Sequence, residues 1–338
     1  MAATIRDVAK AAGVGVGTVS RVLNNSPFVS QPTRERVLAA MAALDYQPSP
    51  TARRLALGRT HTIGVITPFF TRPAFVGRLN GILAELTATN YDLVLFSINT
   101  PEQRDACFQD VSKFKSVDGM IIIALGVQDA DATVIKHWNV PTVLLDSHHP
   151  DLPSIAIDDT GGGRLATEHL IALGHRKIAF IGDTFDNPFG FISSQRRYLG
   201  YRQALETAGF RYRPAYQRLG DHGRYVAHQL ALELLELHDP PTAIFAASDT
   251  QALGVLEAAH ARGLRVPEDL SVIGYDDIEI AEYLDLTTIH QPMYSSGQQA
   301  ATLLFELLSE NPPEETHILL PVEVVQRGTT APPRTAHG

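Results

Sequence analysis

The sequence is poor in cysteine and in long apolar runs. Cys107 is the only cysteine among 338 residues, which excludes an intramolecular disulfide framework and a zinc site built from several cysteines. No apolar stretch approaches the ~20 residues of a membrane span, and the chain does not open with a charged segment followed by an apolar run, as a signal peptide does. These absences lead us to expect a cytoplasmic protein with no membrane partner.

Motifs of common catalytic, cofactor and metal sites are also missing. The segment "DDTGGGR" lacks the Lys-Ser/Thr of a P-loop and the G-x-G-x-x-G order of a dinucleotide site, so we interpret residues 161–163 as a loose strand-to-helix turn. No G-x-S-x-G elbow occurs. The spacing of His169 and His175, and the adjacent pair His148 and His149, does not fit a metal site on one helix face. We therefore expect no enzyme activity, no metal and no cofactor.

The net charge of −9 is unevenly distributed along the chain. Residues 1–60 contain eight Lys or Arg and three Asp or Glu, a balance of +5, which leaves −14 for the remainder. Contacts with phosphate supply the sequence-independent part of DNA affinity. A basic head on an acidic body is therefore expected where only the head binds nucleic acid.

Apolar residues at helical spacing begin in the first dozen residues. The positions i, i+3, i+4 and i+7 of a first helix are Ile5, Val8, Ala9 and Ala12. Thr4, with Asp7 three residues later, is suited to cap its start. Gly13 can adopt the positive φ of a tight turn, after which a second short helix is predicted to begin near Val16.

A third helix is predicted after Ser30 or Gln31, with Pro32 in its first turn. Its expected apolar stripe is Val37, Leu38, Met41 and Leu44. Three short helices with a glycine turn between the first two match the helix-turn-helix pattern, in which the second helix enters the DNA major groove. The polar face of that helix is formed by Gly17, Thr18, Ser20, Arg21 and Asn24. On spacing alone, a small helical subdomain with a solvated polar face remains the alternative.

After residue 60, apolar runs alternate with helical segments. The expected buried strands are 61–67, 92–98, 119–125, 141–146, 154–158, 177–182, 242–248 and 270–276. The expected helices between them are 75–89, 164–173, 197–208, 225–237 and 250–262. This alternation predicts an α/β fold with parallel sheets covered by helices on both faces. Roughly 270 residues are many for one such unit, so two packed units are expected.

Polar and aromatic residues follow several of these strands, where ligands bind in doubly wound sheets. The candidate pocket residues are Phe69, Phe70, Phe75, Asp146, Asp158, Ser248, Asp249, Tyr275, Asp276, Asp277 and Met293. Carboxylates with aromatic rings suit a polyhydroxylated ligand, because a carboxylate accepts from neighbouring hydroxyls while a ring covers an apolar sugar face. The alternative for each aspartate is that it caps a turn or a helix.

Several segments together resemble the LacI-type family of bacterial transcription repressors. They are "TIRDVAKAAGVGVGTVSRVLNN", "VSQPTRERVLAAMAALDYQPSPTARRLA", "IGVITP", "HLIALGHRKIAFIG", "RRYLGYRQAL", "FAASDTQALGVL", "GLRVPEDLSVIGYDD", "LTTIHQP" and "LPVEVVQRGTT". The resemblance spans nearly the whole chain. It implies a helix-turn-helix head joined by a hinge helix to a two-lobed, periplasmic-binding-protein-like core with three crossovers between the lobes.

The expected boundaries follow from this resemblance. The head covers 1–46, the hinge 47–60, the core 61–330 and a flexible tail 331–338. Within the core, the N-lobe takes about 61–160 with 290–322, and the C-lobe about 161–289 with 323–330.

The resemblance also implies roles for single residues. The expected DNA-binding set is Thr4, Val16, Gly17, Thr18, Ser20, Arg21, Asn24, Ser30, Thr33, Arg53 and Leu55. Of these, Leu55 matches a leucine that wedges between base steps in the minor groove. The expected effector-binding set is Phe69, Phe75, Asp146, Asp158, Phe189, Arg197, His222, Ser248, Asp249, Asp276 and Met293.

The sequence departs from the family pattern at a few positions. Gly15 stands where relatives have an N-cap serine, Ser248 where many have asparagine, and His222 where an aromatic residue is common. The loop "TFDNPFGFI" is rich in aromatic residues, so Phe189 or Phe191 is a candidate to close over a ligand. These departures leave the hydroxyl pattern of the effector open.

The features together predict a DNA-binding repressor controlled by a small molecule, most simply a mono- or disaccharide. A regulator with a nucleobase-type co-repressor, a stand-alone sugar-binding protein and an enzyme of sugar metabolism are the alternatives. The family reads palindromic operators as dimers. A homodimer is expected rather than a tetramer, because the tail "TTAPPRTAHG" has no leucine heptads.

Overall fold

The computed structural model describes residues 3–23, 26–46, 60–110 and 114–334. The chain forms two compact units, one of Met1–Thr62 with Ser112–Asp118 and one of Ile63–Val111 with Gly119–Gly338. Asn24 and most of the expected hinge, including Arg53 and Leu55, lie outside the described residues.

The first unit contains the three predicted head helices, α1 (Ile5–Ala12), α2 (Val16–Leu23) and α3 (Gln31–Ala43). A capping box formed by Thr4 and Asp7 starts α1, and Gly13 ends it with a φ of 64°. The three helices bury one small apolar cluster: Val8, Ala9, Ala12, Val19, Val22, Val37 and Ala40. A core of this size fits a helix-turn-helix, whose other faces are free for DNA.

The apolar stripe predicted for α3 is wrong in part. Val37 is buried and Met41 is partly buried against the cluster, but Leu38 is 50% exposed and Leu44 36% exposed. Ala40 is buried instead, because α1 and α2 cover only a narrow face of α3. Arg34 reaches back from α3 and donates to the carbonyl oxygens of Val22 at 3.4 Å and of Ser26 at 2.9 Å.

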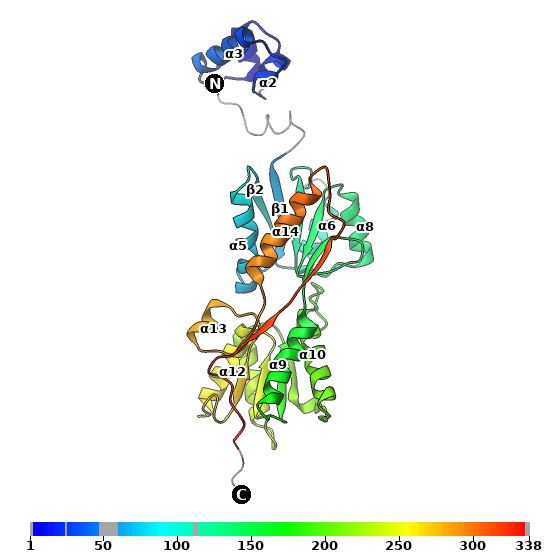
Figure 1. Ribbon diagram of the computed structural model, residues 1–338, viewed down its shortest axis with the longest axis vertical. Coiled ribbons are helices and arrows are strands. Elements are labelled where there is room, and N and C mark those ends of the chain that lie inside the picture. Colours follow the sequence, from blue (N-terminus) through cyan, green and yellow to red (C-terminus); the bar gives the residue numbers. More distant parts are fainter. Residues whose placement is uncertain (1–2, 24–25, 47–59, 111–113, 335–338) are drawn as a thin grey trace. The chain divides into compact units, whose positions relative to one another are not determined.

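The second unit consists of two lobes, each built on a parallel sheet (Figure 1). The N-lobe sheet has the order β11-β5-β4-β3-β1-β2. Its strands are β1 (Thr62–Pro68), β2 (Asp92–Ile98), β3 (Gly119–Ile123), β4 (Thr142–Leu145), β5 (Ser154–Ile157) and β11 (His317–Leu320). Its helices are α5 (Pro73–Thr87), α6 (Pro101–Gln109), α8 (Asp129–His137) and α14 (Met293–Leu307).

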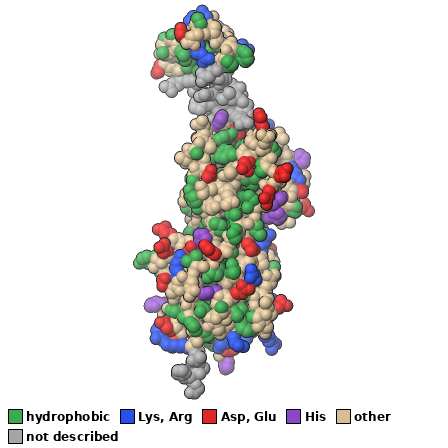
Figure 2. Space-filling model, in the orientation of Figure 1, with side chains coloured by type: hydrophobic (Ala, Val, Ile, Leu, Met, Phe, Trp, Pro, Cys, Tyr) green, Lys and Arg blue, Asp and Glu red, His purple; other side chains and the backbone are tan. Residues whose placement is uncertain are grey.

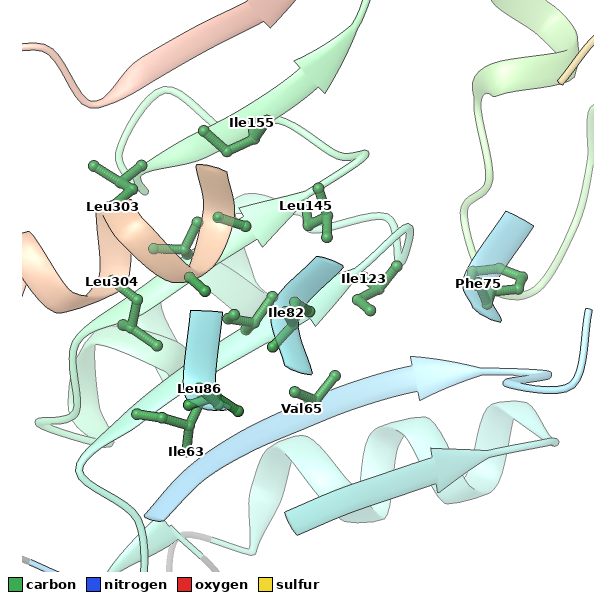
Figure 3. Close-up of a cluster of buried hydrophobic side chains, with 14 of the residues drawn as sticks. Ile63, Val65, Phe75, Ile82, Leu86, Ile123, Leu145, Ile155, Leu303 and Leu304 are labelled. Carbon is green, nitrogen blue, oxygen red and sulfur yellow. The ribbon is translucent and has the colours of Figure 1, made fainter. Parts of the chain in front are cut away.

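The core of the N-lobe lies between its sheet and the pair α5 and α14 (Figure 3). Alternate residues of the strands, such as Ile63 and Val65 in β1, point into it, as the two-residue period of a strand requires. Ile82 and Leu86 from α5 and Leu304 from α14 fill the space between them.

The C-lobe sheet has the order β7-β6-β8-β9. Its strands are β6 (Ile178–Asp183), β7 (Gln217–Gly220), β8 (Ala243–Ala246) and β9 (Ser271–Ile273). Its helices are α9 (Asp159–Ala172), α10 (Ser193–Thr207), α11 (Arg224–Leu235), α12 (Asp249–Ala261) and α13 (Glu279–Tyr283), with a 3-10 turn at Pro214–Tyr216. Successive β6 residues face opposite cores: Phe180 belongs to the cluster with α9 and α10, and Ile181 to that with α11 and α12. The sheet is therefore covered on both faces, as predicted.

The chain connects the lobes at three places. It passes from β5 into α9, returns from β10 (Thr288–His290) into α14, and crosses again from β11 to β12 (Glu323–Val325), which pairs antiparallel with β10. The red and orange segments of Figure 1 show the last two connections running between the lobes. Because of these crossings, each lobe is discontinuous in sequence.

Three local expectations need correction. Residues 161–163 are not a loose turn: they lie inside α9, where glycine is needed because a Cβ on Gly163 would stand 2.0 Å from the Arg197 carbonyl oxygen. Met293 does not follow a strand into a pocket but begins α14. Ala331, placed in the flexible tail, is bound to the C-lobe, since its carbonyl accepts from Ser271 at 3.0 Å and its N–H donates to the same hydroxyl at 3.1 Å.

Candidate functional site

The exposed face of α2 is the candidate DNA-binding surface. Val16 is 43% exposed, Gly17 and Arg21 are exposed, and Thr18 and Ser20 are half-buried. A Cβ built on Gly17 meets nothing within 4 Å, so no described residue of the head requires glycine there. These side chains face away from the small core that Val19 and Val22 bury on the opposite side of the helix.

Three other residues expected at the DNA have partners within the head. The Thr4 hydroxyl belongs to the capping box of α1, 2.7 Å from Asp7 Oδ2. Ser30 precedes α3, and its hydroxyl lies 2.9 Å from that of Thr33. All three are at helix starts, where backbone N–H groups point outward and suit a phosphate.

A cavity lies between the lobes of the second unit. Its lining includes six of the expected effector residues: Phe75, Asp146, Arg197, His222, Ser248 and Asp276. Further lining residues that the sequence did not single out for this site include Arg72, Arg78, Asp183, Ser194, Thr250, Ile278 and Gln291. We call this cavity the inner chamber.

Arg197 reaches the inner chamber from α10 and is 6% exposed. Its Nε donates to Asp159 at 2.8 Å, and its Nη1 donates to the Ala247 carbonyl at 2.6 Å and to Asp276 at 3.3 Å. The guanidinium carbon also lies 3.6 Å from the ring centroid of Tyr275. These contacts fix the guanidinium in one orientation at the cavity wall.

Arg78 reaches the same chamber from α5 in the other lobe and is 1% exposed. Its Nη2 lies 2.8 Å from Asp146 Oδ2 and 2.8 Å from Gln291 Oε1, and its Nη1 donates to the Ala74 carbonyl at 3.1 Å. Sequence reasoning missed Arg78 because it lies within a helix rather than after a strand. The sequence feature that could have identified Arg78 is a positive charge on the otherwise apolar face of a predicted helix.

Gln291 joins the two arginine clusters. It accepts from Arg78 at 2.8 Å and donates through Nε2 to Asp276 Oδ1 at 2.5 Å. Asp276 in turn accepts from Arg197. A buried hydrogen-bonded chain therefore runs from one lobe to the other through the segment between β10 and α14.

Burial changes the acidity of this cluster. Desolvation raises the pKa of Asp146 to about 6, against the opposing effect of the Arg78 charge. Desolvation also raises the pKa of Asp276, although Arg197 and Arg78 oppose the shift. For Arg197, burial lowers the pKa, but the nearby carboxylates of Asp159 and Asp276 outweigh it and hold the group cationic.

Two of the expected effector aspartates have structural partners. Asp158 caps α9 and accepts from the Gly161 N–H at 2.8 Å. Asp249 is fully buried and accepts from the Thr288 hydroxyl at 2.6 Å and from the Ile278 N–H at 2.9 Å. Neither lines the inner chamber. Their positions agree with the capping alternative that the sequence left open.

A second hollow, which we call the outer chamber, adjoins the inner one. The two share Arg72, Asp183, Phe191, Ser194 and His222 in their walls. The rings of Phe69, Phe185 and Phe189 line the outer chamber in addition. Phe69 and Phe189 thus lie at the outer chamber, whereas Met293 lies against α5 near Gly77.

The described residues contain neither a metal-ligating cluster nor a membrane-spanning helix. Among them, no group of three His, Cys, Asp or Glu side chains is placed to hold a metal ion. Within the same part of the chain, every helix is too short or too polar to cross a bilayer.

On the face drawn in Figure 2, acidic side chains are spread over both lobes of the core among basic ones.

Comparisons with known proteins agree with this geometry. Residues 4–49 match the model of bacterial regulatory proteins of the lacI family, and residues 167–330 match a periplasmic binding protein-like domain. The ribose operon repressor of Escherichia coli (strain K12) is 34% identical over 332 residues, which cover 97% of this chain and 99% of that protein.

Two solved structures are similar over almost the whole chain. A lac repressor dimer bound to operator and the anti-inducer ONPF superposes with a TM-score of 0.82 at 34% identity, covering 98% of this chain and 100% of that one. A complex of the transcriptional regulator CelR with cellobiose gives a TM-score of 0.72 at 32% identity, covering 97% and 99%.

Proposed function

Because the chain belongs to the LacI family of bacterial regulatory proteins, we propose that it is a cytoplasmic transcriptional repressor whose operator affinity is set by a small molecule in the inner chamber. One observation carries this proposal: a single chain combines an exposed recognition helix with a charged cavity between two lobes. A stand-alone sugar-binding protein explains the cavity but not the head. An enzyme of sugar metabolism does not explain the head.

The effector that fits best is a carbohydrate. Asp146 and Asp276 present carboxylate oxygens to the chamber, Arg197 presents a guanidinium, and Phe75 adds an aromatic face. This combination binds neighbouring hydroxyls and an apolar sugar face. The similar ribose operon repressor and the CelR–cellobiose complex support a sugar by analogy.

The cavity also suggests how binding is transmitted. Asp146 and Arg78 belong to the N-lobe, and Arg197 and Asp276 to the C-lobe, so a ligand that contacts both sets favours one arrangement of the lobes over another. The segment that precedes β1 is held by Asp118, which accepts from the N–H groups of Thr60 at 2.6 Å and His61 at 2.8 Å. A lobe movement that displaces Asp118 therefore also displaces Thr60 and His61, which lie at the end of the expected hinge segment and directly after it.

DNA recognition is assigned to the exposed face of α2. Arg21 is suited to pair bidentately with a guanine in the major groove. The contribution of Arg53 and Leu55, which lie outside the described residues, follows from the family resemblance alone. We further propose that the chain acts as a homodimer on a palindromic operator, as the operator-bound lac repressor dimer suggests.

Fluorescence anisotropy with labelled upstream DNA tests this function. The protein should bind one DNA segment tightly, and one member of a panel of monosaccharides, disaccharides and nucleobases should change that affinity. The variants Asp276→Asn and His222→Ala should keep the DNA affinity and lose the response, since neither residue belongs to the head. Arg213→Met, on the surface of the C-lobe, serves as the matched control.

The proposal fails if no upstream DNA binds, or if both cavity variants respond like the unaltered protein. If a nucleobase changes the affinity for DNA and no sugar does, the nucleobase-type co-repressor is the correct alternative.

A further inference from the structure

The outer chamber is lined differently from the inner one. Four phenylalanines, Phe69, Phe185, Phe189 and Phe191, contribute to its wall. The inner chamber shares only Phe191 with this set and adds Phe75, and its lining includes six charged side chains: Arg72, Arg78, Asp146, Asp183, Arg197 and Asp276. The chambers therefore offer two chemically distinct surfaces to one molecule.

Phe191 lies at the boundary, because it lines both chambers. One face of its ring stacks on Phe189, with centroids 5.4 Å apart and an interplanar angle of 15°. Phe189 is 7% exposed and meets Phe69 edge-on at 5.1 Å, so it supports Phe191 from behind. A ring held in this way presents a fixed flat surface.

The loop that carries these rings is fastened across the cleft. The Gly126 N–H in the N-lobe donates to the Phe189 carbonyl at 2.9 Å. A Cβ on Gly126 would stand 2.5 Å from the Gly190 carbonyl oxygen, so the two backbones meet where no side chain fits. Asn187 closes the loop on itself by accepting from the Phe191 N–H and donating to its carbonyl, both at 2.8 Å. These contacts hold the aromatic wall in a fixed position, which lowers the entropic cost of binding a ligand.

Polar groups stand at the edge of this wall. Asp183 and His222 line both chambers, and His222 Nδ1 lies 3.2 Å from Asp183 Oδ1. Gln195 and Asp221 line the outer chamber alone. A flat apolar face flanked by carboxylates and an amide suits a pyranose ring, whose faces are apolar and whose hydroxyls point outward.

We propose that the outer chamber is a second sugar subsite, so that the effector is a two-ring carbohydrate with one ring in each chamber and Phe191 stacked on the outer ring. This inference rests on the proposed function, because it specifies the class of carbohydrate effector of which one ring binds in the inner chamber. The empty space in the two chambers amounts to about 690 Å³ and about 830 Å³, counted with space that is open to solvent.

Isothermal titration calorimetry on the full chain tests the proposal. The probes are glucose, galactose, mannose and ribose, the disaccharides cellobiose, maltose, lactose and trehalose, and the nucleosides adenosine and cytidine. One disaccharide should bind at least about tenfold more tightly than either monosaccharide it contains.

Variants then locate the second ring. Phe191→Ala and the milder Phe191→Leu should weaken that disaccharide about tenfold, with a smaller loss for its monosaccharide because Phe191 also borders the inner chamber. Phe185→Ala, at a ring that lines the outer chamber alone, should weaken the disaccharide and change the affinity for the monosaccharide less than about twofold. Phe70→Ala is the matched control, because Phe70 is 39% exposed and lines neither chamber. Asp276→Asn should weaken both sugars alike.

Three outcomes overturn the proposal while the proposed function stands: disaccharides that bind no tighter than monosaccharides, Phe191 variants that weaken both sugars equally, or a nucleoside as the tightest ligand. If no probe binds, or if Asp276→Asn leaves every affinity unchanged, the inner chamber is not the carbohydrate site and the proposed effector class fails as well.

Discussion

Arg78 and Arg197 occupy equivalent positions in the two lobes. Each is followed three residues later by a glycine, Gly81 or Gly200, that packs against the backbone of a second helix. A Cβ on Gly81 would stand 2.0 Å from the Tyr294 carbonyl oxygen, and one on Gly200 2.0 Å from that of Thr160. Both arginines therefore reach the cavity from helices that pack closely against a neighbouring helix, α5 against α14 and α10 against α9.

The Arg78–Asp146 pair should be strongly coupled in stability. Arg78→Met leaves the Asp146 carboxylate almost buried without its cation, so we expect a loss of about 3–5 kcal/mol in the free energy of unfolding. The double variant Arg78→Met/Asp146→Asn should recover most of that loss. Urea denaturation of the single and double variants measures the coupling.

The exposed pair of Arg213 and Asp239 provides the comparison. Both side chains are about half exposed, so Arg213→Met should cost less than about 1 kcal/mol. Equal losses for Arg78→Met and Arg213→Met would contradict the structural role assigned to Arg78.

Close helix packing makes Gly200 sensitive to a single methyl group. Gly200→Ala forces α10 away from α9, and we expect a loss of about 1–3 kcal/mol together with weaker effector binding, because Arg197 moves with α10. Thermal unfolding and calorimetry measure the two effects. Gly17→Ala is the control: its Cβ meets nothing within 4 Å, so the core should melt unchanged. A Gly200→Ala protein with unaltered stability would show that α9 and α10 tolerate separation.

The stability of the core should fall as the pH rises from about 6.5 to about 8. Desolvation, with the nearby Asp276 charge, raises the pKa of Asp249 to about 8, well above its value in the unfolded chain. In this window the folded state keeps a proton that the unfolded state has lost, so the free energy of unfolding decreases with pH by up to about 1.4 kcal/mol per unit and levels off above pH 8. Asp146, with a pKa of about 6, has largely titrated below this window.

Urea denaturation across the pH series tests this assignment. Asp249→Asn should make the free energy of unfolding less dependent on pH in this window. Glu310→Gln, at an exposed position, should leave the pH dependence unchanged. The same slope in Asp249→Asn would mean that another group carries the proton.

Arg21 should determine a guanine preference in the operator. Selection from random DNA should yield a palindrome with a strong guanine in each half-site, and Arg21→Ala should relax that position at a cost of about 1–3 kcal/mol. Lys10→Ala, exposed on α1, should leave the preference intact. An unchanged sequence logo for Arg21→Ala would show that Arg21 does not contact a base in the operator.

Local sequence patterns were enough to predict the fold class, the three head helices and most strands of the core. Helix spacing, strand alternation and glycine turns are local patterns, and each reports the face that a residue buries. Asp276 was found from its position after a strand, whereas Arg197 was expected from the family resemblance alone.

Which residues share the cavity depends on how distant segments of the chain pack together. Arg78 and Gln291 are separated by more than two hundred residues, yet they meet because the chain crosses between the lobes at the end of β10. Asp158 and Asp249 follow strands as Asp146 does, but the fold turns their carboxylates to helix caps and buried hydroxyls. A residue's position after a strand is encoded locally, whereas the direction and partners of its side chain depend on segments that packing brings together.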